Sequence, residues 1–350
     1  MTATLLALAL LAAPPTRPAE GVDALQAQVR ELRRQEIERL RSLLTLADAA
    51  GDTTARRFAY RRLSRLEAAT PDDRLALAVL SLKAGDLDEA RTILAEQREH
   101  DAADLRIVHL LAEVERRAGK QAESDALLGT ARTMRPADKA AHLAAGDFLA
   151  ATGLVPQAED EWRRVIAIKA ARPAVQDVEA HLRLANLARL REDHPNAVEH
   201  LRAALKLAED DLDLPGVSTD WLTVELAMAL RDADRIDEAR PFLPAVEQYH
   251  RERLERDPTD ATSMNALGWF YAGVGKKLDE GIALLEKAVA LRPKEPAYLD
   301  TLAELHFRKG DPNKALALID KAIALKPDNL DYYRRQRAKF NRAIGATREE

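Results

Sequence analysis

The chain has 350 residues, of which 47% are hydrophobic and 32% charged, and its formal net charge is -5. That balance allows a buried core with a well-solvated surface, and neither sign dominates enough to favour nucleic acid or an anionic membrane. Cysteine is absent, which excludes disulfides, cysteine-ligated zinc, thiol catalysis and a lipid-modified N-terminal cysteine.

The N-terminal segment carries a short apolar run from Leu5 to Ala13, which ends at Pro14 and Pro15. The run has the length of the apolar region of a signal peptide and is too short to cross a bilayer as a helix. No Lys or Arg precedes it, and no clear cleavage motif follows it. We predict a signal peptide at residues 1–19 and a periplasmic or secreted protein. The alternative is a cytoplasmic protein that retains this segment.

A repeat runs along the chain. Four glycines follow one another at a constant spacing of 34 residues: Gly51, Gly85, Gly119 and Gly153. Between them the residues predict a helix, a tight turn and a second helix. Pro293 and Pro327 are also 34 residues apart, and each follows the end of a predicted helix, which proline cannot continue without losing a backbone hydrogen bond. The period therefore predicts a series of helical hairpins.

Two C-terminal units carry this repeat most completely. The unit that starts at Ala261 carries three large residues and one glycine at fixed positions of the repeat: Met264, Leu267, Gly268 and Tyr271. The unit that starts at Pro296 continues the same order: Leu299, Leu302, Ala303, His306, Ala315, Ile319, Ala322 and Pro327. The pattern resembles the tetratricopeptide repeat family, whose unit is a 34-residue helical hairpin. Weaker units in the same phase extend the resemblance over about residues 37–344.

The resemblance implies an all-α fold, a right-handed superhelical solenoid of helical hairpins with N- and C-terminal capping helices. Small residues such as Gly268 and Gly281 let the two helices of a hairpin approach closely, and larger residues fill the space between hairpins. One hairpin cannot bury its apolar side alone, so each unit supplies part of its neighbour's core.

Departures from the 34-residue period predict how the chain divides into segments. We predict these segments: a signal peptide at 1–19, an N-terminal helix extension at 20–36, an N-terminal repeat array at 37–209, an acidic Pro-Gly elbow at 210–219, a C-terminal repeat array at 220–329, a capping helix at 330–344 and a disordered tail at 345–350. The elbow rests on an acidic run before Pro215 and Gly216, and the cap on a final helix with no second helix after it.

Catalytic and metal-binding motifs are absent from the sequence. None of the eight histidines forms a ligand motif, and there is no nucleophile elbow, Walker loop or dinucleotide fingerprint. We therefore expect no enzyme activity, no cofactor and no metal. The basic run at residues 55–65 puts Arg57, Arg61 and Arg65 on one helix face. That face could meet phosphate or an acidic partner, but a solvated outer face is the interpretation we favour.

The family resemblance also implies a binding surface, because such arrays typically bind peptides or proteins along the first helices of their hairpins. The repeat phase maps this groove to twelve residues: Arg106, His109, Arg116, Asn186, Arg189, Trp221, Met228, Arg231, Asn265, Trp269, Phe307 and Arg308. Aromatic residues, Met and Arg are enriched at protein interfaces. For Trp221 and Trp269, burial under a neighbouring helix is the alternative.

The aromatic stretch ALGWFYAGVG, residues 266–275, divides along the same phase. Leu267, Gly268 and Tyr271 fall at packing positions, Phe270 is expected to lean on the preceding repeat, and only Trp269 is directed into the groove. The stretch is therefore predicted to be mostly hairpin packing rather than a cofactor site.

Together these features favour a non-catalytic scaffold for protein–protein interaction in a bacterial cell-envelope assembly. The expected partner is a protein or peptide, without nucleic acid, metal or a transmembrane segment, and no oligomeric state is predicted. A cytoplasmic adaptor or regulator, or a non-catalytic subunit of an enzyme complex, is the alternative. Binding of acidic C-terminal peptides is disfavoured, because Glu179 and Glu225 occupy positions where that function uses Lys or Asn.

Overall fold

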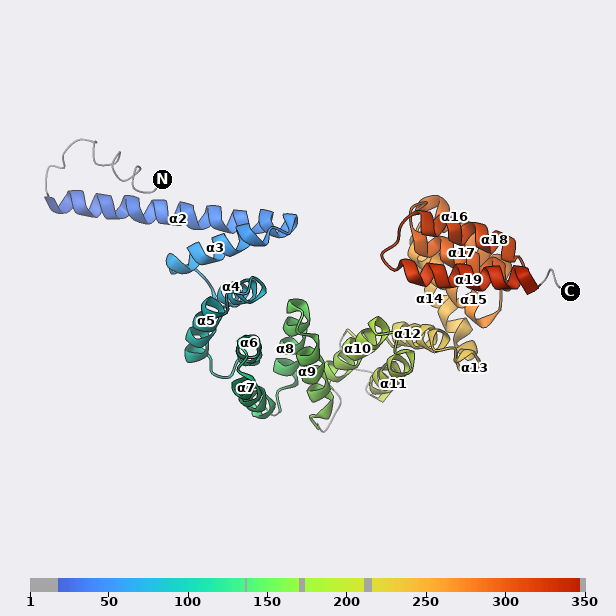
Figure 1. The fold of residues 1–350 in the computed structure, drawn as a ribbon, viewed down its shortest axis with the longest axis horizontal. Coiled ribbons are helices and arrows are strands. Elements are labelled where there is room, and N and C mark those ends of the chain that lie inside the picture. The colour runs from blue at the N-terminus through green and yellow to red at the C-terminus, as the bar shows by residue number, and fades with distance from the viewer. Residues whose placement is uncertain (1–17, 136, 170–173, 211–215, 347–350) are drawn as a thin grey trace. The chain divides into compact units, whose positions relative to one another are not determined.

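The computed structural model describes residues 18–135, 137–169, 174–210 and 216–346 (Figure 1). Most of the predicted signal peptide, part of the predicted elbow and the last four residues of the predicted tail lie outside the described residues. The chain divides into two compact units, residues 1–158 and 159–350.

The first unit is helical throughout its described part, with these helices: α2 Pro18–Ala50, α3 Thr53–Arg65, α4 Pro71–Lys83, α5 Leu87–His100, α6 Leu105–Arg117, α7 Gln121–Thr133 and α8 Lys139–Thr152. Consecutive helices form antiparallel pairs, with α2 against α3, α4 against α5 and α6 against α7. The predicted extension at residues 20–36 is continuous with the first repeat helix, because α2 runs unbroken through both.

The second unit continues the hairpins with these elements: α9 Val155–Ala167, which begins in the first unit, α10 Val175–Leu190, α11 His194–Asp210, α12 Thr219–Asp232, α13 Ile236–Ala239, the 3-10 turn η1 Arg240–Phe242, α14 Leu243–Arg256, α15 Ala261–Val274, α16 Leu278–Leu291, α17 Pro296–Arg308, α18 Pro312–Ala324 and α19 Leu330–Ala346. The described residues therefore confirm an all-α chain of sequential helical hairpins. The final helix ends two residues beyond the predicted cap.

The turns between paired helices follow the predicted period. Gly51, Gly85, Gly119 and Gly153 all adopt a positive φ between 67° and 92°. This left-handed conformation is available to glycine at little cost. Glu192 takes the same place in the next hairpin with a φ of 57°. The turn therefore keeps its geometry although the residue at this position is not glycine.

One hairpin departs from the regular form. The second helix expected after Asp234 is divided into the short helix α13, the turn η1 and the long helix α14. Pro241 and Pro244 lie at the junctions, where a proline has no N–H to donate to the preceding turn.

The close approach within a hairpin is visible at Gly268 and Gly281. A Cβ atom at Gly268 would lie 2.1 Å from Leu285 Cδ2 and 3.5 Å from the carbonyl oxygen of Gly281. Leu285 is fully buried, so it has little room to move. The small residues therefore set the spacing of α15 and α16, as the repeat pattern predicts.

Burial of the neighbouring aromatic residues confirms their packing role. Phe270 and Tyr271 are both 0% exposed. The Tyr271 hydroxyl donates to Glu247 Oε1 of the preceding hairpin at 2.9 Å. Leu267 is also buried, so this part of the aromatic stretch belongs to the core.

One hydrophobic core runs through much of the second unit, from Val178 to Phe340. It crosses the predicted elbow, because Ala208 before it and Leu222 after it belong to the same buried cluster. The elbow as a domain boundary at residues 210–219 stays a prediction.

We expect Gly268→Ala to destabilise the fold by about 1–3 kcal/mol, because the added methyl group overpacks the α15–α16 contact. Gly129→Ala is the matched control, since no atom lies within 4 Å of the added Cβ in α7. Helix propensity predicts that this control is neutral or up to about 1 kcal/mol more stable. Thermal unfolding followed by circular dichroism compares the two, and a Gly268→Ala protein as stable as the wild type would contradict the assignment.

Candidate functional site

The candidate site lies in the second unit, where the first helices of three successive hairpins lie side by side. Helix α12 contacts α15, and α15 contacts α17. The last helix, α19, reaches α17 through side-chain hydrogen bonds. Residues far apart in the sequence therefore meet on one row of helices.

The buried side chain of Arg231 supports Trp269, one of the predicted groove residues. The guanidinium carbon of Arg231 lies 3.8 Å from the centroid of the Trp269 ring, a cation–π contact. Arg231 Nη1 also donates to the backbone oxygen of Trp269 at 3.1 Å, and Nη2 donates to Asp232. Burial lowers the pKa of Arg231 to about 9, so it is still a cation at neutral pH.

The slot for this arginine exists because of a glycine one helical turn after Trp269. A Cβ atom at Gly273 would lie 2.2 Å from Arg231 Cδ and 2.3 Å from its Cγ. The absent side chain therefore lets the methylene groups of Arg231 lie against α15. Arg231 is only 8% exposed, which makes it a support for Trp269 rather than a surface that a partner touches.

A buried carboxylate lies on the next helix. Asp300 of α17 is 5% exposed and accepts a hydrogen bond from the Tyr332 hydroxyl of α19 at 2.9 Å. Its other oxygen, Oδ1, is buried without a hydrogen-bond partner. Burial raises the pKa of Asp300 to about 6, although the Tyr332 hydrogen bond and the cations Lys339 and Arg231 act in the opposite direction.

A second carboxylate anchors the rim of the site. Glu304 accepts from Arg308 Nε at 2.8 Å and from Lys339 Nζ at 2.6 Å. The Lys339 ammonium also lies 4.8 Å from the centroid of the Phe307 ring. Two cations and one aromatic ring are thus held in place around a single acidic side chain.

We call the accessible part of this region the Trp269 surface and define it by five of the predicted groove residues: Met228, Asn265, Trp269, Phe307 and Arg308. Each is half-buried or exposed. The side-chain oxygen of Asn265 is itself buried and has no hydrogen-bond partner. The surface therefore combines the apolar side chains of Met228, Trp269 and Phe307 with the polar side chains of Asn265 and Arg308.

Three other predicted residues of the second unit lie apart from this cluster. Arg189 of α10 donates to Glu225 Oε2 of α12 at 2.7 Å, so its charge is used between hairpins. Asn186 is exposed on α10, and Trp221 is half-buried against the core.

The predicted residues of the first unit differ in accessibility. Arg116 is exposed and paired with Glu113, and Arg106 bonds to Asp104 and Asp72. His109 is only 4% exposed, because neighbouring helices cover this face of α6. Its assignment to the groove stays a prediction, with little of its side chain accessible.

The basic run on α3 is largely neutralised by the next hairpin. Arg57 Nη2 lies 2.5 Å from Glu89 Oε2, and Arg61 Nη2 lies 2.7 Å from the same oxygen. Burial alone would raise the pKa of Glu89, but hydrogen bonds from Arg61, Ser81 and Arg57 lower it to about 2.

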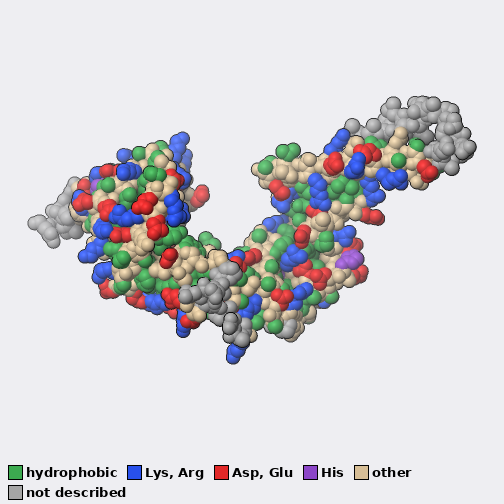
Figure 2. Space-filling model, turned by 180° about the vertical axis from the view of Figure 1, so that it is seen from behind, with side chains coloured by type: hydrophobic (Ala, Val, Ile, Leu, Met, Phe, Trp, Pro, Cys, Tyr) green, Lys and Arg blue, Asp and Glu red, His purple; other side chains and the backbone are tan. Residues whose placement is uncertain are grey.

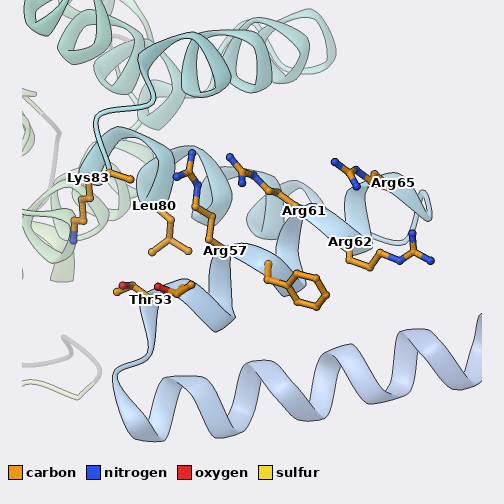
Figure 3. A pocket seen from close by; sticks show the side chains of 10 residues that line it. Thr53, Arg57, Arg61, Arg62, Arg65, Leu80 and Lys83 are labelled. Atoms are coloured by element: carbon orange, nitrogen blue, oxygen red, sulfur yellow. The ribbon is translucent and has the colours of Figure 1, made fainter. Parts of the chain in front are cut away.

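These arginines line a cavity of about 500 Å³ together with Arg65 and Lys83 (Figure 3). Because Arg57 and Arg61 are held by the carboxylate of Glu89 in α5, the run is neither a free phosphate site nor a simple solvated face. On the side shown in Figure 2, acidic and basic side chains are interspersed over the surface.

Among the described residues, no group of three or more potential ligands is placed to hold a metal ion. No helix in the described ranges is both long and apolar enough to cross a membrane.

Three contributors to the site were missed by the sequence reasoning: Gly273, Tyr332 and Lys339. Extending the 34-residue phase into the predicted cap would not have found the two residues of α19, because each precedes a packing position. Tyr333 and Phe340 then fall at packing positions, and both are buried. No pattern in the sequence distinguishes Gly273, because its role depends on where Arg231 lies.

Successive two-helix units with shared cores define the protein as a helical-hairpin repeat protein. The particular family follows from a sequence comparison, in which the tetratricopeptide repeat model matches residues 275–340. Residues 275–340 therefore carry tetratricopeptide repeats, and the described helices before them form hairpins of the same kind. Members of this family are generally protein–protein interaction modules and are typically non-catalytic.

Several solved structures are similar to this chain at low identity. A tetratricopeptide repeat protein from Parabacteroides merdae is 13% identical, with coverage of 77% of this chain and 98% of that one and a TM-score of 0.41. YrrB, described as having an unusual peptide-binding site, is 18% identical, with coverage of 56% and 90% and a TM-score of 0.39.

PilW, described as a type IV pilus biogenesis factor, is 15% identical, with coverage of 65% of this chain and 97% of that one and a TM-score of 0.39. No curated protein matches the chain. The assignment to the family therefore rests on the sequence match and on the hairpins themselves.

The raised pKa of Asp300 predicts how stability depends on pH. An aspartate has a pKa near 3.8 when unfolded and about 6 here, so the fold binds the proton more tightly. The contribution of Asp300 to stability is thus largest below pH 4 and falls as the pH rises to 6. We expect Asp300→Asn to gain about 1–3 kcal/mol over the wild type between pH 4 and pH 7.

Urea unfolding at several pH values measures this difference. Asp328→Asn is the control, because Asp328 is exposed. A stability difference between Asp300→Asn and wild type that stays constant across the range would contradict the assignment.

Proposed function

We propose that the chain is a non-catalytic scaffold that binds a partner protein or peptide on the Trp269 surface. The observation that carries this proposal is the buried Arg231 beneath Trp269, beside the buried and incompletely hydrogen-bonded Asp300. Burying such groups lowers stability unless they are fully paired. Strongly perturbed ionisable groups of this kind concentrate at functional sites.

The chemistry of the surface suggests what it recognises. Trp269, Phe307 and Met228 offer apolar contact, and the first two are rigid aromatic side chains of the kind that dominate interface energies. Arg308 and Lys339 share the single carboxylate of Glu304. A partner that presents an apolar side chain beside an acidic group therefore fits this surface best.

We also propose that the protein is exported and acts in a bacterial cell-envelope assembly. The apolar run at the N-terminus supports export, and the absence of enzyme motifs together with the repeat family supports a scaffold role. A cytoplasmic adaptor, or a non-catalytic subunit of an enzyme complex, is the second candidate. The identity of a captured partner separates these two functions.

Cross-linked capture from source cells tests the Trp269 surface. We expect Trp269→Ala with Phe307→Ala to reduce partner recovery at least about tenfold, because interface aromatics contribute about 2 kcal/mol or more each. Phe58→Ala is the matched control, since Phe58 is 60% exposed in the first unit. Circular dichroism verifies that all three proteins are folded. Equal recovery with the double variant would refute the assignment of this surface.

Export has its own test. If residues 1–19 are a signal peptide, N-terminal sequencing of the protein purified from its cells should begin after this segment. A mature chain that begins at Met1 or Thr2 would rule out cleavage and favour the cytoplasmic alternative.

A further inference from the structure

The first long helix extends beyond the helix that covers it. Helix α2 has 33 residues, whereas its partner α3 has 13 (Figure 1). Helix α3 runs back along α2 and ends level with Arg33, whose guanidinium donates to the backbone oxygen of Leu66. The part of α2 before Arg33 therefore projects past the end of α3.

This projecting part carries an exposed apolar stripe. Val22, Leu25, Val29 and Leu32 are 56%, 44%, 49% and 50% exposed. Their spacing of three, four and three residues places them on one side of a helix. Four neighbouring large apolar side chains that face water form a patch of the kind that marks an interaction surface.

The stripe continues an interface that is already formed further along the same helix. Val22 and Leu40 are 18 residues apart, which is five helical turns, so they lie on the same side of α2. Leu40 and Leu44 are buried against Ala59 and Leu63 of α3. The projecting stripe is thus the same apolar face without a covering helix.

The residue types indicate what covers it. In heptad notation Val22 and Val29 take position a, and Leu25 and Leu32 take position d. Val at a with Leu at d is the pattern that favours parallel, two-stranded coiled coils. We propose that the stripe pairs with the same stripe of a second copy of this chain, in parallel and in register, to form a homodimer.

The residues that flank the stripe are compatible with this pairing. Gln28 at position g would face Arg33 at position e of the other copy, and Gln26 is also uncharged, so no like charges are opposed. The charged residues Asp23, Arg30 and Arg34 lie on the outer side of the helix. Arg34 is already paired with Glu31.

Sedimentation of the full chain over a wide concentration range tests the proposal. Because two heptads form a small contact, we expect a dimer that dissociates on dilution. Leu25→Glu with Val29→Glu should weaken dimerisation at least about thirtyfold, since it places charges in the apolar seam. Ala24→Glu with Ala27→Glu is the matched control on the same helix, because both residues are exposed and take the outer positions c and f.

The control should dimerise like the wild type. A wild type that is monomeric at every concentration, a trimer, or an equal effect of the two sets of substitutions would overturn the proposal. All the changed residues are exposed, and circular dichroism verifies that helicity is retained.

The absence of cysteine allows a direct test of orientation. In a parallel, in-register pair the two copies of residue 25 are adjacent, so Leu25→Cys should form an intermolecular disulfide readily on oxidation. Ala27→Cys, at the outer position f, should not. Cross-linking that occurs only between Leu25→Cys and Val29→Cys chains would indicate an antiparallel pair and overturn the parallel arrangement.

Discussion

The close approach of two helices within each hairpin is the constraint on which the rest of the fold depends. At Gly268 even one methyl group would overlap Leu285 across the hairpin. Helices held this close share one narrow apolar seam and leave their larger side chains directed at the neighbouring hairpin. Stability in such a fold comes from contacts between units, as the continuous core from Val178 to Phe340 shows.

The same constraint creates the candidate site. Because equivalent helices lie side by side, residues separated by roughly one repeat come into contact. Arg231 meets Trp269 after 38 residues, Arg189 meets Glu225 after 36, and Asp300 meets Tyr332 after 32. A site assembled in this way needs no loop to bring its parts together. Its geometry is as rigid as the stacking of the hairpins.

Much of the fold was predictable because it depends on periodic features. The turn glycines, the small residues of the hairpins and the buried Tyr271 all follow from the phase of the repeat. The phase gives the direction of a side chain, but not how deeply its neighbours cover it. The phase assigns Arg231 and His109 to the groove without indicating that both are almost completely buried. It also cannot indicate the role of Gly273, which depends on where Arg231 lies.

The last helix combines two roles that are usually separate. Helix α19 closes the core with Phe340, which is fully buried, and it also supplies Tyr332 and Lys339 to the polar groups beneath the Trp269 surface. Helix α19 therefore supports the proposed Trp269 surface as well as the core. A truncation within α19 would remove the hydrogen bonds to Asp300 and Glu304 as well as part of the core, so its effects on stability and on the proposed surface could not be separated.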